Sequence, residues 1–217
     1  MWMVNVEVLI SDPVRKSRKI RNERLQHVVD ALGNVLFSQT TPTMARFEGA
    51  KVVDLLQARS RLKTKNTGSG SCPIQAVFAA ALNDATEMAP SNRVPASTLG
   101  ALTDKLTWLR AEGGPYASLN FGRNHAQAAL VGPGGIEERS DLMIGLIAMT
   151  PYTRVPDHRQ NQPQVCIHLT EGEFLSADGE WRCAVDGTPF YHQADSDFTM
   201  RSTSRPLIML WLQRLSG

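Results

Sequence analysis

The second half of the chain is a series of short apolar segments separated by turn signals, and this pattern constrains the fold most. The segments span 124–132, 142–150, 164–170, 180–185 and 206–213. Turn sequences separate or follow them, namely Gly132-Pro133-Gly134-Gly135, Asp178-Gly179 and Asp186-Gly187. Short strands at regular spacing, bounded by such residues, are typical of a β-sandwich or barrel. We therefore expect a β-domain over 115–217.

The first half of the chain has helical periodicity instead. After the start signal Asp12-Pro13, apolar residues recur at helical spacing over 20–36. Further helices are expected over 41–62, 74–88 and 96–111. Pro90 is expected to stop the third helix, and Gly113-Gly114 to end the fourth. Residues 1–114 are thus predicted to form a helical N-terminal extension that packs on the β-domain.

Composition limits the partners that bulk charge can attract. The 217 residues include 23 Lys and Arg against 21 Asp and Glu, a net charge of +2. This balance gives no electrostatic case for a nucleic-acid or membrane partner, and no apolar run is long enough to span a membrane. The N-terminal segment has no basic n-region or small-residue cleavage site, so no signal peptide is expected. Three cysteines without a CxxC spacing indicate a reducing compartment, and we expect a cytoplasmic protein.

Three stretches of the C-terminal half carry a family resemblance. They are NHAQAALVGPGG at 124–135, IGLIAMTPYTRVPDHR at 144–159 and FTMRSTSRPLIMLWLQ at 198–213. They are similar to the entry strand, the metal-approach segment and the closing motif of cupins. More narrowly, they resemble the cupin-type dimethylsulfoniopropionate (DMSP) lyases of marine bacteria, which also carry a helical N-terminal extension. The resemblance implies a mainly β, cupin-like barrel, or jelly-roll, in a bacterial protein.

The resemblance also implies a chemistry. Family members bind a divalent transition metal (Zn, Fe or Mn) through a His and a Glu of the first motif and a His of the second. A nearby Tyr ligates the metal or takes a proton. In the implied β-elimination a base removes the proton next to the carboxylate of DMSP, and dimethyl sulfide leaves to give acrylate. The expected partner is a small anionic or zwitterionic ligand such as DMSP, with a homodimer possible.

A gap-free match places other residues at the positions of this chemistry. Gln160 falls at the first-motif His, Gln164 at the Glu and Cys166 at the Tyr. Phe198 falls at the second-motif His, and His158 matches a further His just before the first metal ligand. Glutamine is a weak, neutral ligand for transition metals, and phenylalanine is no ligand. The match therefore predicts a degenerate metal site, in which Gln160, Gln164 and Phe198 line the pocket in place of the metal ligands.

Strand alternation leaves a second arrangement open. Gln164, Cys166 and His168 share one face of their strand, and the apolar residues between them occupy the other. If the first face lines the barrel, His158, Cys166, His168 and His192 are candidates for a relocated metal site, most naturally for zinc. The alternatives are a partly exposed or hydrogen-bonded strand histidine at 168 and a structural histidine at 192.

Other side chains are candidates for catalysis or ligand binding. Cys166 would be a nucleophile if His168 lowered its pKa, and an inert buried thiol otherwise. Tyr152 and Tyr191 are phenols that could act as a base or simply line the barrel. Arg154 is a candidate pocket residue for pairing an anionic ligand, with a surface position as the alternative.

Three functions remain open on the sequence. The first is a divergent DMSP lyase, a carbon–sulfur lyase. The second is a non-catalytic cupin that binds a small ligand or regulates through it. The third is an enzyme that uses the relocated His/Cys site. The residues at the metal positions favour the second, whereas the overall resemblance favours the first.

Overall fold

The computed structural model describes residues 21–57, 72, 74–88, 90–111, 120–176, 178–184 and 187–215. The helices are α1 (Glu23–Leu36), α2 (Thr43–Gln57), α3 (Gln75–Met88), α4 (Pro90–Gly100), the 3-10 turn η1 (Thr103–Lys105) and the short α5 (Phe121–Asn124). The strands are β1 (His125–Val131), β2 (Leu142–Met149), β3 (His158–Gln160), β4 (Gln164–His168), β5 (Gly172–Leu175), β6 (Trp181–Ala184), β7 (Phe190–His192), β8 (Ser196–Phe198), β9 (Met200–Arg201) and β10 (Leu207–Arg214).

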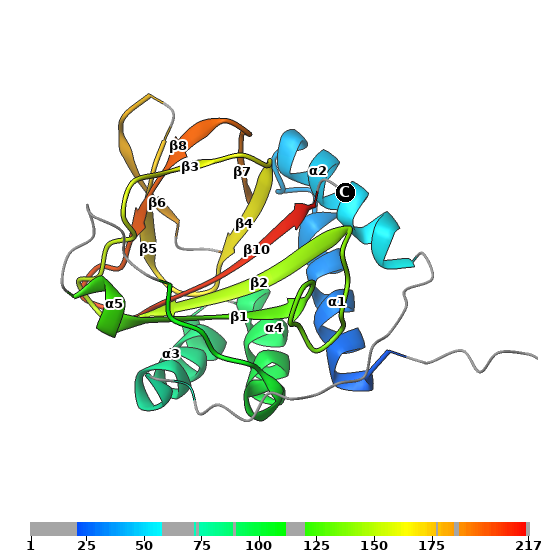
Figure 1. The fold of residues 1–217 in the computed structure, drawn as a ribbon, viewed down its shortest axis with the longest axis horizontal. Helices are drawn as coiled ribbons and strands as arrows, with labels where there is room; N and C mark the ends of the chain where they lie inside the picture. The colour runs from blue at the N-terminus through cyan, green and yellow to red at the C-terminus, as the bar shows by residue number, and fades with distance from the viewer. Residues whose placement is uncertain are drawn as a thin grey trace, which may run out of the picture.

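Within this part of the chain the strands form one large and two small antiparallel sheets. The large sheet has the order β1-β2-β10-β4-β7, so the last strand, β10, lies between β2 and β4. The small sheets, β3-β8 and β6-β5-β9, lie over one face of the large sheet (Figure 1). This is a cupin-like β-barrel with a helical N-terminal extension, and the predicted fold class is confirmed.

Side chains of the large sheet alternate between a helix side and an interior side. On β4 and β10 the helix-side residues are Val165, Ile167, Ile208, Leu210 and Leu212, which share one core with the helices. Cys166 and Met209 belong to a second cluster inside the barrel. Trp211 lies opposite Cys166 in the register, so the two strands alternate in phase. The predicted alternation of 164–168 is thus observed.

The helices cover the outer face of the large sheet (Figure 1). Helix α1 begins where the Asn22 side chain accepts hydrogen bonds from the backbone N–H groups of Arg24 (3.1 Å) and Leu25 (3.4 Å). Its buried stripe is Leu25, Val28, Val29, Ala31, Leu32 and Leu36. The start signal predicted at Asp12-Pro13 lies outside the described residues. In the described part, no helix combines the length and apolarity needed to cross a membrane.

The helix predicted over 96–111 is wrong in both bounds. Pro90 begins α4 as well as following α3, because proline is tolerated at the first position of a helix. The helix ends at Gly100, and Leu109 then pairs with Gln127 of β1 through two backbone hydrogen bonds of 2.8 and 2.9 Å. Pairing with the sheet edge satisfies these backbone groups and overrides the helical periodicity. The stop at Gly113-Gly114 and the boundary at 114/115 lie outside the described residues.

A buried ion-pair cluster ties α2 to the loop between β1 and β2. Glu137 is 2% exposed and pairs with Arg21 at 2.5 Å and with Arg139 at 3.7 Å. The same two guanidinium groups donate to the carbonyls of Leu56 (2.8 Å) and Leu55 (2.9 Å) at the end of α2. Cations are favoured at a helix C-terminus. Glu137 thus helps to hold both helix-capping arginines, and Asp141 pairs with Arg139 as well at 2.6 Å.

Replacing Glu137 by Gln should therefore destabilise the fold by about 3 kcal/mol, because the Arg21 guanidinium loses its buried counter-charge, while Arg139 keeps its pair with Asp141 at 2.6 Å. Urea unfolding monitored by circular dichroism measures the change. Glu138→Gln, at the half-buried neighbouring position, is the matched control and should stay within about 0.5 kcal/mol of the wild type. Equal stability of the two variants would contradict this role.

Candidate functional site

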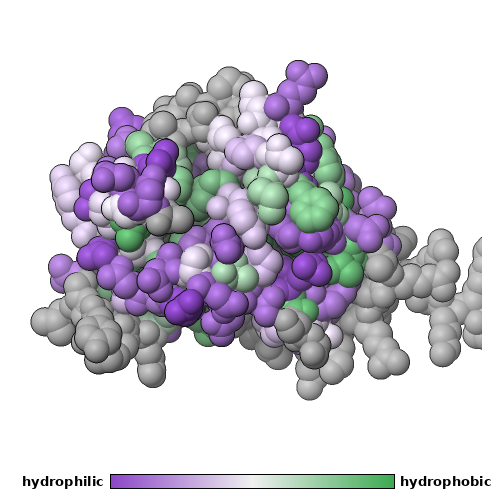
Figure 2. All heavy atoms as spheres, turned by 90° about the horizontal axis from the view of Figure 1, so that it is seen from above, coloured by the Kyte–Doolittle hydropathy of each residue, from purple (hydrophilic) through white to green (hydrophobic). Residues whose placement is uncertain are grey.

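A cavity of about 560 Å³ lies between the interior side of the large sheet and the strands that cross over it. Its described lining residues are Ala111, Phe121, Gln127, Met143, Ile147, Val155, Pro156, Asp157, His158, Gln160, Gln164, Phe198, Met200, Met209, Trp211 and Gln213. In the view from above, hydrophobic side chains are visible between hydrophilic ones (Figure 2). Both the volume and the mainly apolar wall are typical of small-molecule sites.

Three glutamine amides from three different strands meet in this wall. The side-chain oxygen of Gln213 on β10 accepts a hydrogen bond from Gln160 Nε2 on β3 (3.0 Å) and another from Gln164 Nε2 on β4 (2.7 Å). Gln213 and Gln164 also lie directly opposite each other in the β10–β4 register. We call Gln160, Gln164 and Gln213 the glutamine cluster.

Sequence reasoning missed Gln213, although it singled out the other two glutamines. The alternation of β10 contains the signal, since Met209, Trp211 and Gln213 occupy the interior side between helix-side leucines. A polar residue in phase with the lining residues of a closing strand is a candidate pocket residue. Gln127 on β1, also absent from the predicted site, lines the cavity as well.

Two residues that the sequence placed at the family's Tyr and second-motif His positions, Cys166 and Phe198, are buried near the glutamine cluster. Cys166 is fully buried, and its thiol lies 3.9 Å from the side-chain oxygen of Gln164, to which it donates. Burial raises the pKa of the Cys166 thiol, so it remains protonated and unreactive at neutral pH. Phe198 is buried between the rings of His158 (5.5 Å) and His192 (4.6 Å).

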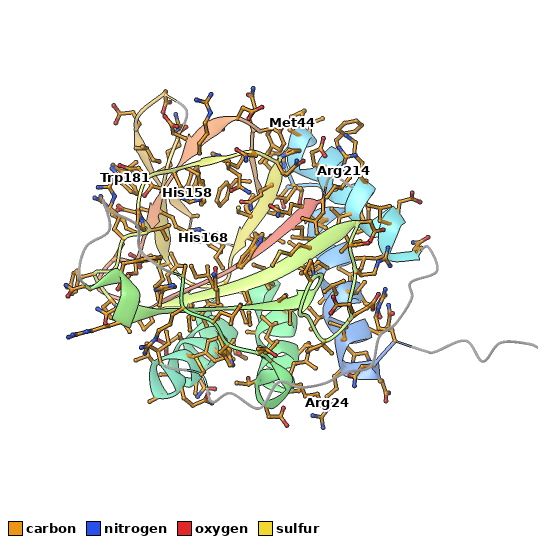
Figure 3. All side chains as sticks on the ribbon, viewed as in Figure 1. Arg24, Met44, His158, His168, Trp181 and Arg214 are labelled. Carbon is orange, nitrogen blue, oxygen red and sulfur yellow. The ribbon has the colours of Figure 1, made fainter. Side chains whose placement is uncertain are left out.

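The three histidines proposed for a relocated site lie in different surroundings. His158 is exposed at the cavity, and its Nδ1 pairs with the Pro156 carbonyl at 2.9 Å. His192 Nε2 pairs with the Ser196 hydroxyl at 3.1 Å, and burial lowers the pKa of this ring. His168 is the last residue of β4, a strand of the large sheet (Figure 3). In the described part of the chain, no three His, Cys, Asp or Glu side chains are grouped to hold a metal.

His168 is 1% exposed, and neither ring nitrogen makes a hydrogen bond of normal geometry to a described residue. The backbone of Ala184 faces the ring and favours its protonated form, but burial has the larger effect. The rings of Phe190 (5.5 Å) and Phe174 (6.4 Å) lie beside it. Burial lowers the pKa of His168 to about 4, so the ring is neutral at physiological pH. A neutral ring enclosed by aromatic side chains does not activate the Cys166 thiol by charge.

The remaining predicted residues do not line the cavity. Tyr152 is 78% exposed and occupies a left-handed turn with φ of 56°. Tyr191 packs against the helix-side core. Arg154 is exposed, pairs with Asp157 at 2.6 Å and lies 5.6 Å from the Trp181 ring. Neither phenol is therefore placed to act on a molecule in the cavity.

Trp211 forms part of the cavity wall because its cross-strand partner is a glycine. Gly145 on β2 lies opposite Trp211 on β10. A Cβ at Gly145 would lie 2.0 Å from Cζ2 of the indole and 2.2 Å from Cε2. The indole thus rests on the glycine backbone, and a larger residue at 145 would move it.

With the geometry established, the comparisons with known proteins identify the family. A sequence model of the DMSP lyases matches residues 46–209. The chain belongs to the DMSP lyase family. No protein of curated function matches it.

Two solved DMSP lyase structures have the same fold. The structure of the DMSP lyase DddQ from Ruegeria pomeroyi DSS-3 is 19% identical with a TM-score of 0.61, over 85% of this chain and 91% of that chain. A structure described as DMSP lyases RdDddP and RnDddQII gives 15% identity and a TM-score of 0.67, over 89% and 93% of the respective chains. At these identities the likeness shows the shared fold.

The neutral His168 should make the protein sensitive to acid. Its pKa is 6.5 in the reference state and about 4 in the folded protein, so the unfolded chain binds more protons between these values. Stability should be fully present above pH 6.5 and fall by about 3 kcal/mol as the pH approaches 4. Urea unfolding at a series of pH values measures the slope.

His168→Leu should flatten this part of the pH dependence, whereas His27→Leu, at an exposed position of α1, should leave it unchanged. An identical acid slope in His168→Leu and the wild type would show that the ring is not held neutral by burial.

Gly145→Ala should cost about 2 kcal/mol of unfolding free energy, because the methyl group overlaps the Trp211 ring. Urea unfolding gives the cost, and the tryptophan emission spectrum reports movement of the indole. In a Trp211→Ala background the same methyl group should cost much less. Equal costs in the two backgrounds would rule out the contact as the cause.

Proposed function

We propose that this member of the DMSP lyase family binds a small organic molecule in its barrel cavity and does not use the family's metal. The single observation that carries the proposal is the convergence of Gln160 and Gln164 on the Gln213 oxygen. In the gap-free match, the first two of these residues occupy positions of metal ligands. Two of the amides share the Gln213 oxygen as their acceptor, and the cavity lies beside them.

The side chains at the family's metal positions do not fit a divalent transition metal. Glutamine amides are neutral, weak ligands, and the Gln164 oxygen already accepts from the Cys166 thiol. Burial keeps that thiol protonated, whereas a thiol ligand must lose its proton. Phe198 offers only carbon atoms. No step of a metal-assisted elimination is therefore assigned to these residues.

The cavity also lacks a well-placed base among the predicted candidates. A general base must reach the proton that it removes, either directly or through one water. Tyr152 projects into solvent, and Tyr191 packs toward the helices. The Cys166 thiol is buried and protonated. The arrangement supports binding of a small molecule better than proton abstraction from it.

A divergent DMSP lyase is the second candidate, and family membership favours it. Of the predicted residues that line the cavity, His158 is the one whose ring could exchange a proton with a bound molecule. This candidate predicts dimethyl sulfide release that is lost in His158→Phe. The binding proposal predicts no such release.

Headspace gas analysis separates the two candidates. With DMSP and Fe, Mn, Zn or Ni, the purified protein should release no more dimethyl sulfide than a protein-free control. Catalytic release by the wild type that is abolished by altering Gln160 or Gln164 would overturn the binding proposal.

Restoring the family's ligand types should create a metal site. The variant Gln160→His, Gln164→Glu, Phe198→His should retain metal after desalting, because two imidazoles and a carboxylate replace neutral groups and a ring. The wild type and the matched control variant Gln160→Asn, Gln164→Asn, Phe198→Leu should not. Elemental analysis measures the content, and stoichiometric metal in the wild type would contradict the proposal.

A further inference from the structure

Some side-chain N–H groups of the glutamine cluster have no hydrogen-bond partner among the described residues. The Gln213 oxygen accepts from both other members, which uses its two lone pairs. The Gln213 NH₂ group has no partner among the described residues, and neither has the side chain of Gln127. Because the amide groups line a cavity, their free N–H groups are available to an acceptor atom of a bound molecule.

Among the described residues that line the cavity there is no lysine or arginine to accompany those donors. The ionisable ones are Asp157 and His158, both exposed, and Asp157 pairs with Arg154 at 2.6 Å. A carboxylate moved from water into such a wall loses hydration without gaining a cation, whereas a carbonyl oxygen loses far less.

The remaining wall suits a short apolar or thioether chain. Three methionines, from β2, β9 and β10, line it together with aromatic residues. Trp211 and Phe198 add flat apolar surface beside the glutamine cluster. Methionine and aromatic side chains adapt well to aliphatic and sulfur-containing groups. The cavity therefore has an apolar wall and a polar, uncharged, donor-rich region.

We propose that the cavity selects an uncharged small molecule with a carbonyl or primary-amide end and a short apolar or thioether body. The amides of Gln213 and Gln127 are its specificity-determining contacts. This inference rests on the small-molecule function proposed above and narrows the class of ligand. We expect the cavity to bind this molecule more tightly than the carboxylate with the same apolar or thioether chain, which differs from it only in its charged end.

A pair of probes with one skeleton tests the selection. They are 3-(methylsulfanyl)propanamide and 3-(methylsulfanyl)propanoate, titrated into the full chain by isothermal calorimetry at neutral pH. The amide should bind about tenfold more tightly, the effect of one buried polar group left without a proper partner. Equal binding, or tighter binding of the carboxylate, would overturn the inference and leave the small-molecule function standing. Binding of neither probe would count against that function as well.

Variants test whether the side-chain amides of Gln213 and Gln127 cause the preference for the amide probe. Gln127→Leu removes one donor and leaves the glutamine cluster intact, so it should reduce the ratio of the two dissociation constants. Gln213→Lys should reverse the preference by adding a cation. Gln193→Leu, at an exposed position, should keep the wild-type ratio. Thermal unfolding checks that each variant folds. If Gln127→Leu does not fold, Gln127→Met takes its place with the same expectation of a reduced ratio. An unchanged ratio in every folded cavity variant would refute the assignment.

Discussion

The alternation of side chains along β4 and β10 determines the rest of the structure. Successive residues of a strand point to opposite faces, so one set packs under the helices and the other faces the cavity. A slip of one residue would exchange the two sets, placing Val165 and Leu212 in the cavity and Gln164 and Gln213 against the helices. The helix-side core and the cavity wall are therefore fixed by one register.

The glutamine cluster shows how that register yields a neutral site. Buried amides need hydrogen-bond partners, and Gln160 and Gln164 find theirs in Gln213 rather than in an ion. The two donors come from the consecutive strands β3 and β4, whereas their common acceptor, Gln213, lies about 50 residues later on β10, which occupies the centre of the large sheet. The same neutrality argues against a transition metal and for an uncharged ligand.

Sequence reasoning predicted the long strands and the phase of β4, because five or more residues are enough to show alternation. It missed β3 and β8, which have three residues each and no readable period. The role of Gln213 depends on β3 crossing over the large sheet, which no local pattern encodes. Tyr152 illustrates the same limit, since its outward direction follows from a turn with a positive φ. The helix predicted over 96–111 failed because tertiary pairing at Leu109 outweighed its periodicity.

The central claim is that the glutamine cluster, and not a metal centre, forms the polar part of this cavity. The most direct test is an anomalous difference map from crystals grown with zinc and manganese, recorded at each absorption edge. The account predicts no peak among Gln160, Gln164 and Phe198, and amide-to-amide density linking Gln160 and Gln164 to Gln213. A peak at full occupancy coordinated by these side chains would contradict it.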